Sequence, residues 1–135
     1  MSSSILFVLG LLFVFGSNKI VTSFADWVRK ASDLPITEKT YKHVPSWILG
    51  DFERLLAFGL VAFAVPQAGT ALIAWLAAKL AANWRRRDAG DDSDEAAIIR
   101  ANTFIALMAG VLSVILGAVG GLIAGYGLGN YGNPE

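Results

Sequence analysis

One uninterrupted apolar stretch, from Ala101 to Gly129, limits most strongly what this chain can fold into. It contains no charged residue, and its length is sufficient for an α-helix to cross the hydrocarbon core of a bilayer. Small residues recur at every fourth position along it, at Ala109, Ser113, Gly117, Gly121, Gly125 and Gly129. Small side chains let helix backbones approach closely in lipid, where the hydrophobic effect does little to bring helices together. The stretch therefore predicts a membrane helix that packs tightly against another helix.

The composition agrees with a membrane protein and excludes several chemistries. Hydrophobic residues make up 55% of the chain and charged residues 16%, against about 25% charged in ordinary soluble domains. Acidic and basic residues are balanced at 11 each, so no net field attracts nucleic acid. Cysteine is absent, which excludes disulfides, thiolate metal sites and cysteine catalysis.

The apolar stretches indicate a single membrane domain over residues 1–135, an all-α integral membrane protein with about three transmembrane helices. Along the chain we expect a first helix, a polar interfacial loop, a second helix, a short connection, a third helix and an irregular tail, at about 4–24, 25–45, 46–84, 85–92, 93–126 and 127–135. The pure apolar part of the first helix, Ile5 to Phe15, is short. An interfacial or half-inserted helix is therefore the alternative to a full span there.

The second segment is longer than a bilayer requires. A helix over 46–84 would be about 55 Å long, against roughly 30 Å of hydrocarbon, so both ends should protrude. We expect Asp51, Glu53 and Arg54 at one interface. The opposite interface should hold the residues that contact lipid head groups and set the orientation: Lys79, Arg85, Arg86 and Arg87.

Pro66 lies in the middle of this second segment and predicts a kink, because proline removes a backbone hydrogen bond and clashes with the preceding turn. Gln67 and Thr70 are the only polar pair deep in the segment. They would either bond to backbone groups freed by the proline or line a pore or small-ligand site. No acidic or basic residue is expected at the centre of the second or third helix, which argues against a proton relay or a charge-coupled transporter.

Two sets of small residues predict how these helices pack. A second row in the last stretch has the period of a left-handed helix pair: Ala106, Gly110, Ser113, Gly117, Gly120, Ala124 and Gly127. The second helix has a small face of its own, at Ala64, Ala68, Ala71, Ala74, Ala78 and Ala81. We expect the two to meet in a tight Ala/Gly-faced antiparallel hairpin. Alternatively, the glycine face forms a glycine zipper with other chains and makes an oligomer, and a face this wide can do both.

The function expected from these features is assembly rather than chemistry. No catalytic set is apparent, so we expect a non-enzymatic structural or accessory subunit of a larger membrane complex, and the alternative is a homo-oligomeric pore or channel. Expected partners are membrane lipids and other membrane-protein chains, without nucleic acid. No cofactor or metal is expected, and any bound lipid or pigment would be supplied by partners. We expect a bacterial inner membrane, with the N-terminus inside and the C-terminus outside.

Overall fold

The computed structural model of this chain describes residues 3–34, 46–85 and 94–131, and every regular element in them is an α-helix. In chain order the helices are α1 (Ser3–Gly16), α2 (Asn18–Ala31), α3 (Ser46–Ala62), α4 (Ala68–Arg85) and α5 (Asp94–Gly127). Two helical stretches are long and apolar enough to cross a membrane: Ser3–Ala31, with 29 residues, and Arg100–Gly127, with 28 residues. The predicted all-α class is confirmed, and the two stretches agree with the predicted first and third membrane helices.

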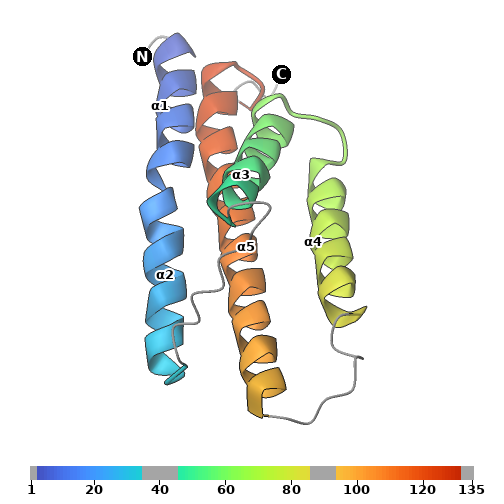
Figure 1. The fold of residues 1–135 in the computed structure, drawn as a ribbon. Helices are drawn as coiled ribbons and strands as arrows, with labels where there is room; N and C mark the ends of the chain where they lie inside the picture. The colour runs from blue at the N-terminus through green and yellow to red at the C-terminus, as the bar shows by residue number, and fades with distance from the viewer. Residues whose placement is uncertain (1–2, 35–45, 86–93, 132–135) are drawn as a thin grey trace.

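α1 and α2 follow one another as a single rod that is interrupted at Ser17 (Figure 1). The Ser17 hydroxyl donates to the Val14 carbonyl oxygen at 2.7 Å, while the Ser17 amide still donates to Phe13 at 2.9 Å. A serine that bonds back to the preceding turn bends a helix, and Gly16 before it has no side chain to oppose the bend. Despite this local bend, α2 continues in the direction of α1 (Figure 1).

The first helical stretch is longer than the 4–24 expected from the sequence. Residues 25–31, within the segment at 25–45, are predicted to form an interfacial turn of helix, and in the structure they continue α2; the part of that segment at 35–45 lies outside the described residues. α2 ends where Asp33 adopts a positive φ of 50° and the Leu34 amide donates to the Arg29 carbonyl at 3.2 Å. This is the Schellman pattern of a helix C-terminus.

α5 is the central helix, and α1 and α3 lie along it in opposite directions (Figure 1). The residues that meet are Gly127 with Ser3 and Gly120 with Val14 for α1, and Gly117 with Arg54 and Gly121 with Phe58 for α3. Residue numbers along α1 fall as those along α5 rise, whereas residue numbers along α3 rise together with those along α5. α5 is therefore antiparallel to α1 and parallel to α3.

The single helix expected over 46–84 is instead two helices joined by a turn at residues 63–67, and this expectation is corrected. α3 ends in a second Schellman motif, in which the Val65 amide donates to Leu60 at 3.0 Å and the Ala64 amide donates to Val61 at 2.9 Å. Ala64 has the positive φ, 48°, that this motif requires. The chain then reverses, and α4 runs back alongside α3 (Figure 1).

Pro66 explains why the chain reverses instead of continuing with a kink. Proline disfavours a helical conformation of the residue before it, and Val65 is not helical in the structure. Gln67 follows with a positive φ of 62°, a second left-handed residue within four positions. Two left-handed residues and a proline together turn the chain through a complete reversal.

The expected hairpin of the second and third segments is therefore replaced by a different arrangement. The glycine-bearing helix α5 packs against α1 and α3, whereas α4 contacts it only slightly. Most of the alanine face expected to meet the glycines is exposed, at Ala64, Ala71, Ala74, Ala78 and Ala81. The sequence correctly located small faces, but in the described structure they do not meet each other.

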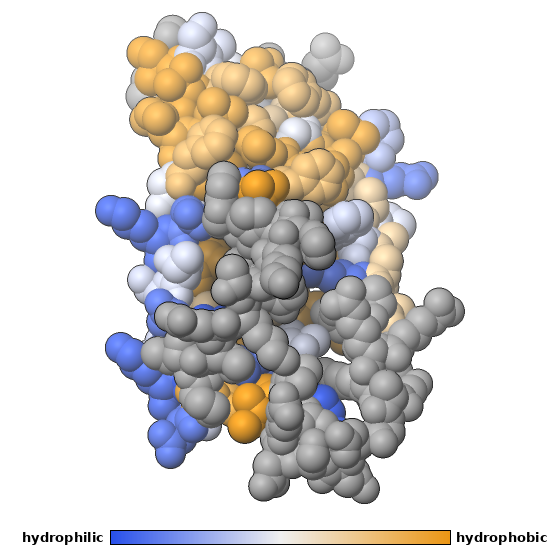
Figure 2. Space-filling view, in the orientation of Figure 1, coloured by the Kyte–Doolittle hydropathy of each residue, from blue (hydrophilic) through white to orange (hydrophobic). Residues whose placement is uncertain are grey.

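Apolar and polar residues are separated along the length of the molecule. Figure 2 shows hydrophobic residues over the end where α1 and the last turns of α5 lie, and polar residues toward the opposite end. Large exposed apolar side chains in this arrangement include Leu12, Phe15, Phe63, Ile115 and Tyr126. A contiguous apolar exterior of this kind is typical of a surface in contact with lipid or another chain.

Candidate functional site

One small face of α5 lies against α3. A methyl group added at Gly121 would lie 2.7 Å from the Phe58 carbonyl oxygen, and one added at Gly117 would lie 2.9 Å from the Arg54 Cα. Ser113, one turn earlier, is also buried. Backbone meets backbone at these positions, so no side chain larger than hydrogen fits at either glycine.

A second small face of α5 lies against α1. A methyl group at Gly120 would lie 2.9 Å from the carbonyl oxygen of Gly10, and one added at Gly10 would lie 3.0 Å from the Cβ of Ala124. The contact involves glycine on both helices, which allows closer approach than glycine on one. Gly117 and Gly121 of the every-fourth row thus face α3, whereas the later members of the second row, Gly120, Ala124 and Gly127, face α1.

The remaining members of the every-fourth row differ in their surroundings. Ala109 is half-buried, and Gly125 lies near the Ala62 carbonyl oxygen and the Tyr131 ring. Gly129 lies beyond the end of α5, is exposed, and has no atom within 4 Å of an added Cβ. Its φ of 78° ends the helix in a Schellman motif, so Gly129 is a helix terminator and its expected packing role is corrected.

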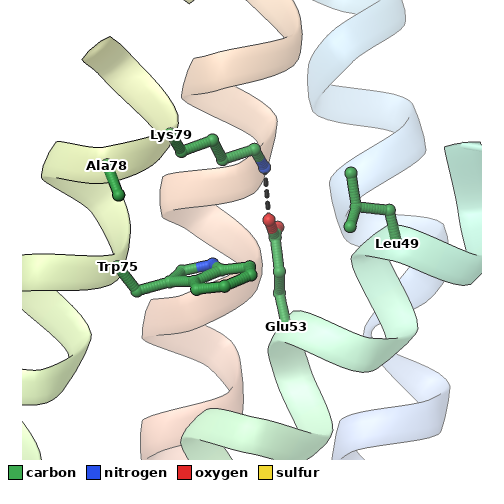
Figure 3. Close-up of a pocket in the computed structure, with 5 residues that line it drawn as sticks. All are labelled: Leu49, Glu53, Trp75, Ala78 and Lys79. Carbon is green, nitrogen blue, oxygen red and sulfur yellow. Dashed lines mark hydrogen bonds and ion pairs between the residues drawn. The ribbon is translucent and has the colours of Figure 1, made fainter. Parts of the chain in front are cut away.

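A charged cluster that the sequence did not reveal is centred on α3. Glu53 is only 1% exposed, and its carboxylate forms an ion pair with Lys79 of α4 (Figure 3). A methyl group at Gly110 would lie 3.2 Å from Glu53 Oε2 and would also collide with the Lys79 ammonium. Glycine at this position of α5 therefore provides the space for the ion pair.

Arg54 forms the second half of the cluster and is likewise 1% exposed. Its guanidinium donates to Asp51, three residues earlier, and to the Asn18 side chain at 3.2 Å. Asn18 is the first residue of α2, so Arg54 joins α3 to the interruption between α1 and α2. Removing one partner of a buried charge leaves the other charge uncompensated, which strongly destabilises the fold.

The cluster lies level with the middle of α5, between Gly110 and Gly117. These residues fall well inside the apolar stretch Arg100–Gly127, so charged side chains are located where we expected none. The expected placement of Glu53 and Lys79 at opposite interfaces is also corrected. Because the chain reverses at residues 63–67, these two residues lie at the same level.

The other predicted polar positions have different surroundings from those expected. Pro66, Gln67 and Thr70 are all exposed at or beside the reversal, so they do not face the interior of the bundle. Arg86 and Arg87 lie outside the described residues, as do the Arg85 side chain and the connection at 86–92. Among the predicted head-group residues, only Lys79 has a described side chain, and it is engaged with Glu53.

A cavity of about 280 Å³ adjoins the ion pair between α3 and α4. Leu49, Glu53, Trp75, Ala78 and Lys79 line it, as Figure 3 shows. The Trp75 ring also lies 6.2 Å, centroid to centroid, from the ring of Phe52. The space is thus bounded by apolar side chains on most sides and by one neutralised charge pair.

One signal in the sequence could have revealed the ion pair. Glu53 lies 13 residues before Pro66, and Lys79 lies 13 residues after it. A reversal at the proline brings equally distant residues of opposite charge to one level. The prediction of a kink at Pro66 concealed this symmetry.

No protein-family model, curated protein or solved structure matches this chain. Its class is therefore defined by its own fold. The described residues form an all-helical protein in which two helical stretches are long and apolar enough to cross a membrane. A charge cluster lies among its helices, level with the middle of α5.

Proposed function

We propose that this chain is a non-enzymatic subunit of a larger membrane assembly and that it joins another membrane chain through α4. In this arrangement α1–α2 and α5 cross the bilayer, and the α3–α4 hairpin enters it from one side. Because Ser3 lies beside Gly127, this topology places both termini on the same side of the membrane. It replaces the topology with the N-terminus inside and the C-terminus outside that three spans would require.

The observation that supports this proposal is the distribution of small and large side chains around α4. Leu72 and Leu76 face α3 and α5, and the bulky residues Ile73 and Leu80 are exposed on another side. The remaining side carries four exposed alanines at helical spacing, Ala71, Ala74, Ala78 and Ala81. Bulky side chains suit lipid, whereas small ones are characteristic of helix–helix contacts in membranes. A helix of another chain is therefore the expected neighbour of the alanine side.

The glycine faces of α5 are less suited to this role, because α1 and α3 already cover them within the chain. The same observation removes the support for a homo-oligomeric pore, which would need that face to line a ring. We therefore assign the partner surface to α4 and not to α5, where the sequence suggested it.

The test is the native mass of the gently extracted protein, compared between Ala74→Leu and Ala106→Leu. Both variants add the same volume at an exposed alanine, on α4 and α5 respectively. We expect the wild type and Ala106→Leu to retain a foreign chain in fixed proportion, and Ala74→Leu to lose it. A wild type that runs as a single 14.4 kDa chain refutes the proposal. An integer multiple of that mass without foreign chains favours the homo-oligomer, and conductance in liposomes becomes the next measurement.

A further inference from the structure

Trp75, which lines the cavity between α3 and α4, carries a hydrogen-bond donor without an acceptor. Trp75 Nε1 is buried and has no hydrogen-bond partner among the described residues. The indole N–H can only donate, so it needs an acceptor, and the described residues supply none. A buried donor left unpaired is unfavourable, and such groups in folded proteins commonly indicate a bound water or ligand.

Lys79 adds further donor capacity at the same place. Its ammonium group carries three N–H donors, and within the described residues one partner, Glu53, accepts from it. Figure 3 shows the Trp75 indole nitrogen on the edge of the ring that faces the Lys79 side chain, with the Glu53 carboxylate beside them. Within the described residues, the Trp75 indole N–H thus has no acceptor, and the Lys79 ammonium has one.

The charges select what kind of acceptor fits. Glu53 and Lys79 neutralise each other, so an anion would be repelled by the carboxylate and a cation by the ammonium. A neutral oxygen acceptor has neither cost. The rest of the wall is apolar, formed by Leu49, Ala78 and the face of the Trp75 ring. Leu49 and the neighbouring Phe52 are also exposed on the outer surface, which gives the cavity an apolar rim.

We propose that this cavity binds an uncharged, apolar molecule through a carbonyl oxygen, which accepts hydrogen bonds from Trp75 Nε1 and Lys79. Its volume of about 280 Å³ accommodates a carbonyl-bearing ring or the glycerol-ester region of a lipid, with any longer chain extending past the rim. Two membrane sources supply this chemistry: the ester carbonyl of a lipid and the ring carbonyl of a quinone. The inference does not depend on the role of α4 in assembly.

The indole N–H itself provides the readout. The chain has four tryptophans, so full-length protein labelled with ¹⁵N-tryptophan gives four indole signals, and Trp75→Phe assigns the relevant one. The protein is kept in alkyl-glycoside micelles, which carry no carbonyl group. It is titrated separately with dioctanoylglycerol, with a decyl-substituted benzoquinone and with dodecane, an apolar control without an acceptor.

We expect at least one carbonyl probe to shift the Trp75 indole signal in a saturable manner, and dodecane to leave it in place. A shift with dioctanoylglycerol alone indicates the lipid source, and a shift with the quinone alone indicates the quinone source. Trp75→Phe keeps an aromatic wall but removes the donor, and should weaken binding about tenfold, as measured by isothermal titration calorimetry in the same micelles, since this variant lacks the indole signal. Trp27→Phe, which alters an exposed tryptophan on α2, should not change it.

Three results overturn the proposal. The first is that neither carbonyl probe shifts the Trp75 signal. The second is that dodecane shifts this signal as much as the carbonyl probes do. The third is that Trp75→Phe binds the effective probe as tightly as the wild type does. The first two are measured on the wild-type protein. If Trp75→Phe fails to fold, Trp27→Phe, Trp47→Phe and Trp84→Phe assign the other three indole signals and leave that of Trp75, so both results remain decisive.

Discussion

The contacts that join α1, α3 and α5 differ in kind from those that hold α4. Within the bundle of three, glycines bring backbones together, as at Gly121 against Phe58. At α4, longer side chains make the contact, through the ion pair of Glu53 with Lys79 and the ring contact of Phe52 with Trp75. A backbone contact tolerates no added atom, whereas long side chains can rearrange. α4 is therefore the helix best able to separate from the rigid bundle of α1, α3 and α5.

The largest effect is expected from filling the backbone contact in the bundle. Gly121→Leu places four carbons where one would already lie 2.7 Å from a carbonyl oxygen, so α5 and α3 must move apart. We expect the free energy of unfolding in detergent to fall by about 3 kcal/mol, the upper part of the range for overpacking.

Val119→Leu is the matched control for this prediction, because Val119 is exposed on the same helix. It should change the free energy of unfolding by less than about 0.5 kcal/mol. Equal stability of the two variants would show that Gly121 is not at a close helix contact.

The next effect concerns α4 alone. Lys79→Met leaves the Glu53 carboxylate buried without its partner, which typically costs about 3 kcal/mol, and α4 can relieve this by separating from α3. Since the chain has no native cysteine, Leu72→Cys introduces a single thiol at the buried contact of α4. We expect Lys79→Met to raise the labelling rate of that thiol roughly a hundredfold.

The double variant Glu53→Gln/Lys79→Met separates loss of charge pairing from loss of packing. It removes both charges together and should restore most of the protection of the thiol. If the double variant is labelled as fast as Lys79→Met, packing and not the ion pair holds α4.

A smaller effect is expected at the capped end of α3. The Asn130 side chain donates to the Ala62 carbonyl oxygen at 2.9 Å, so Asn130→Ala leaves that carbonyl to water. We expect a loss of about 1 kcal/mol in the free energy of unfolding and no change in the labelling of α4. Faster labelling of α4 in this variant would mean that the two regions are coupled more tightly than their contacts indicate.

The smallest effect is expected at the reversal between α3 and α4. Gln67→Gly removes the side chain from a residue with a φ of 62° and should raise stability by less than about 1 kcal/mol. Thr70→Gly, placed inside α4, should lower stability slightly, because glycine disfavours a helix. If both substitutions act in the same direction, the backbone at Gln67 is not strained.

The sequence predicts the central helix well, because its evidence is local. An uninterrupted apolar stretch and a polar start predict a helix at about 93–126, and α5 occupies Asp94–Gly127. The small residues at Gly117 and Gly121 lie where a close approach occurs, but their spacing does not say which helix approaches. Gly10 of α1 completes the second close contact. It belongs to no periodic pattern of small residues, because α1 is short.

The reversal and the charge cluster could not be predicted in the same way, because they depend on contacts distant in sequence. Pro66 is compatible with either a kink or a turn. The outcome here involves Ala64 in a left-handed conformation, for which alanine gives no signal. The cluster follows from the reversal, so the error at Pro66 also displaced Lys79 from its partner Glu53.

The closure of α3 by distant residues has a consequence for the order of folding. Asn130 and Tyr131 donate to the carbonyls of Ala62 and Val61, 68 and 70 residues earlier in the chain. During synthesis at roughly 5–20 residues per second, Asn130 and Tyr131 therefore emerge about 3–14 s after the carbonyl groups that they bind. Until then the Schellman bonds to Leu60 and Val61 close the end of α3, and the Ala62 carbonyl oxygen bonds to water. The hairpin of α3 and α4 is thus formed early but completed only when the segment after α5 arrives.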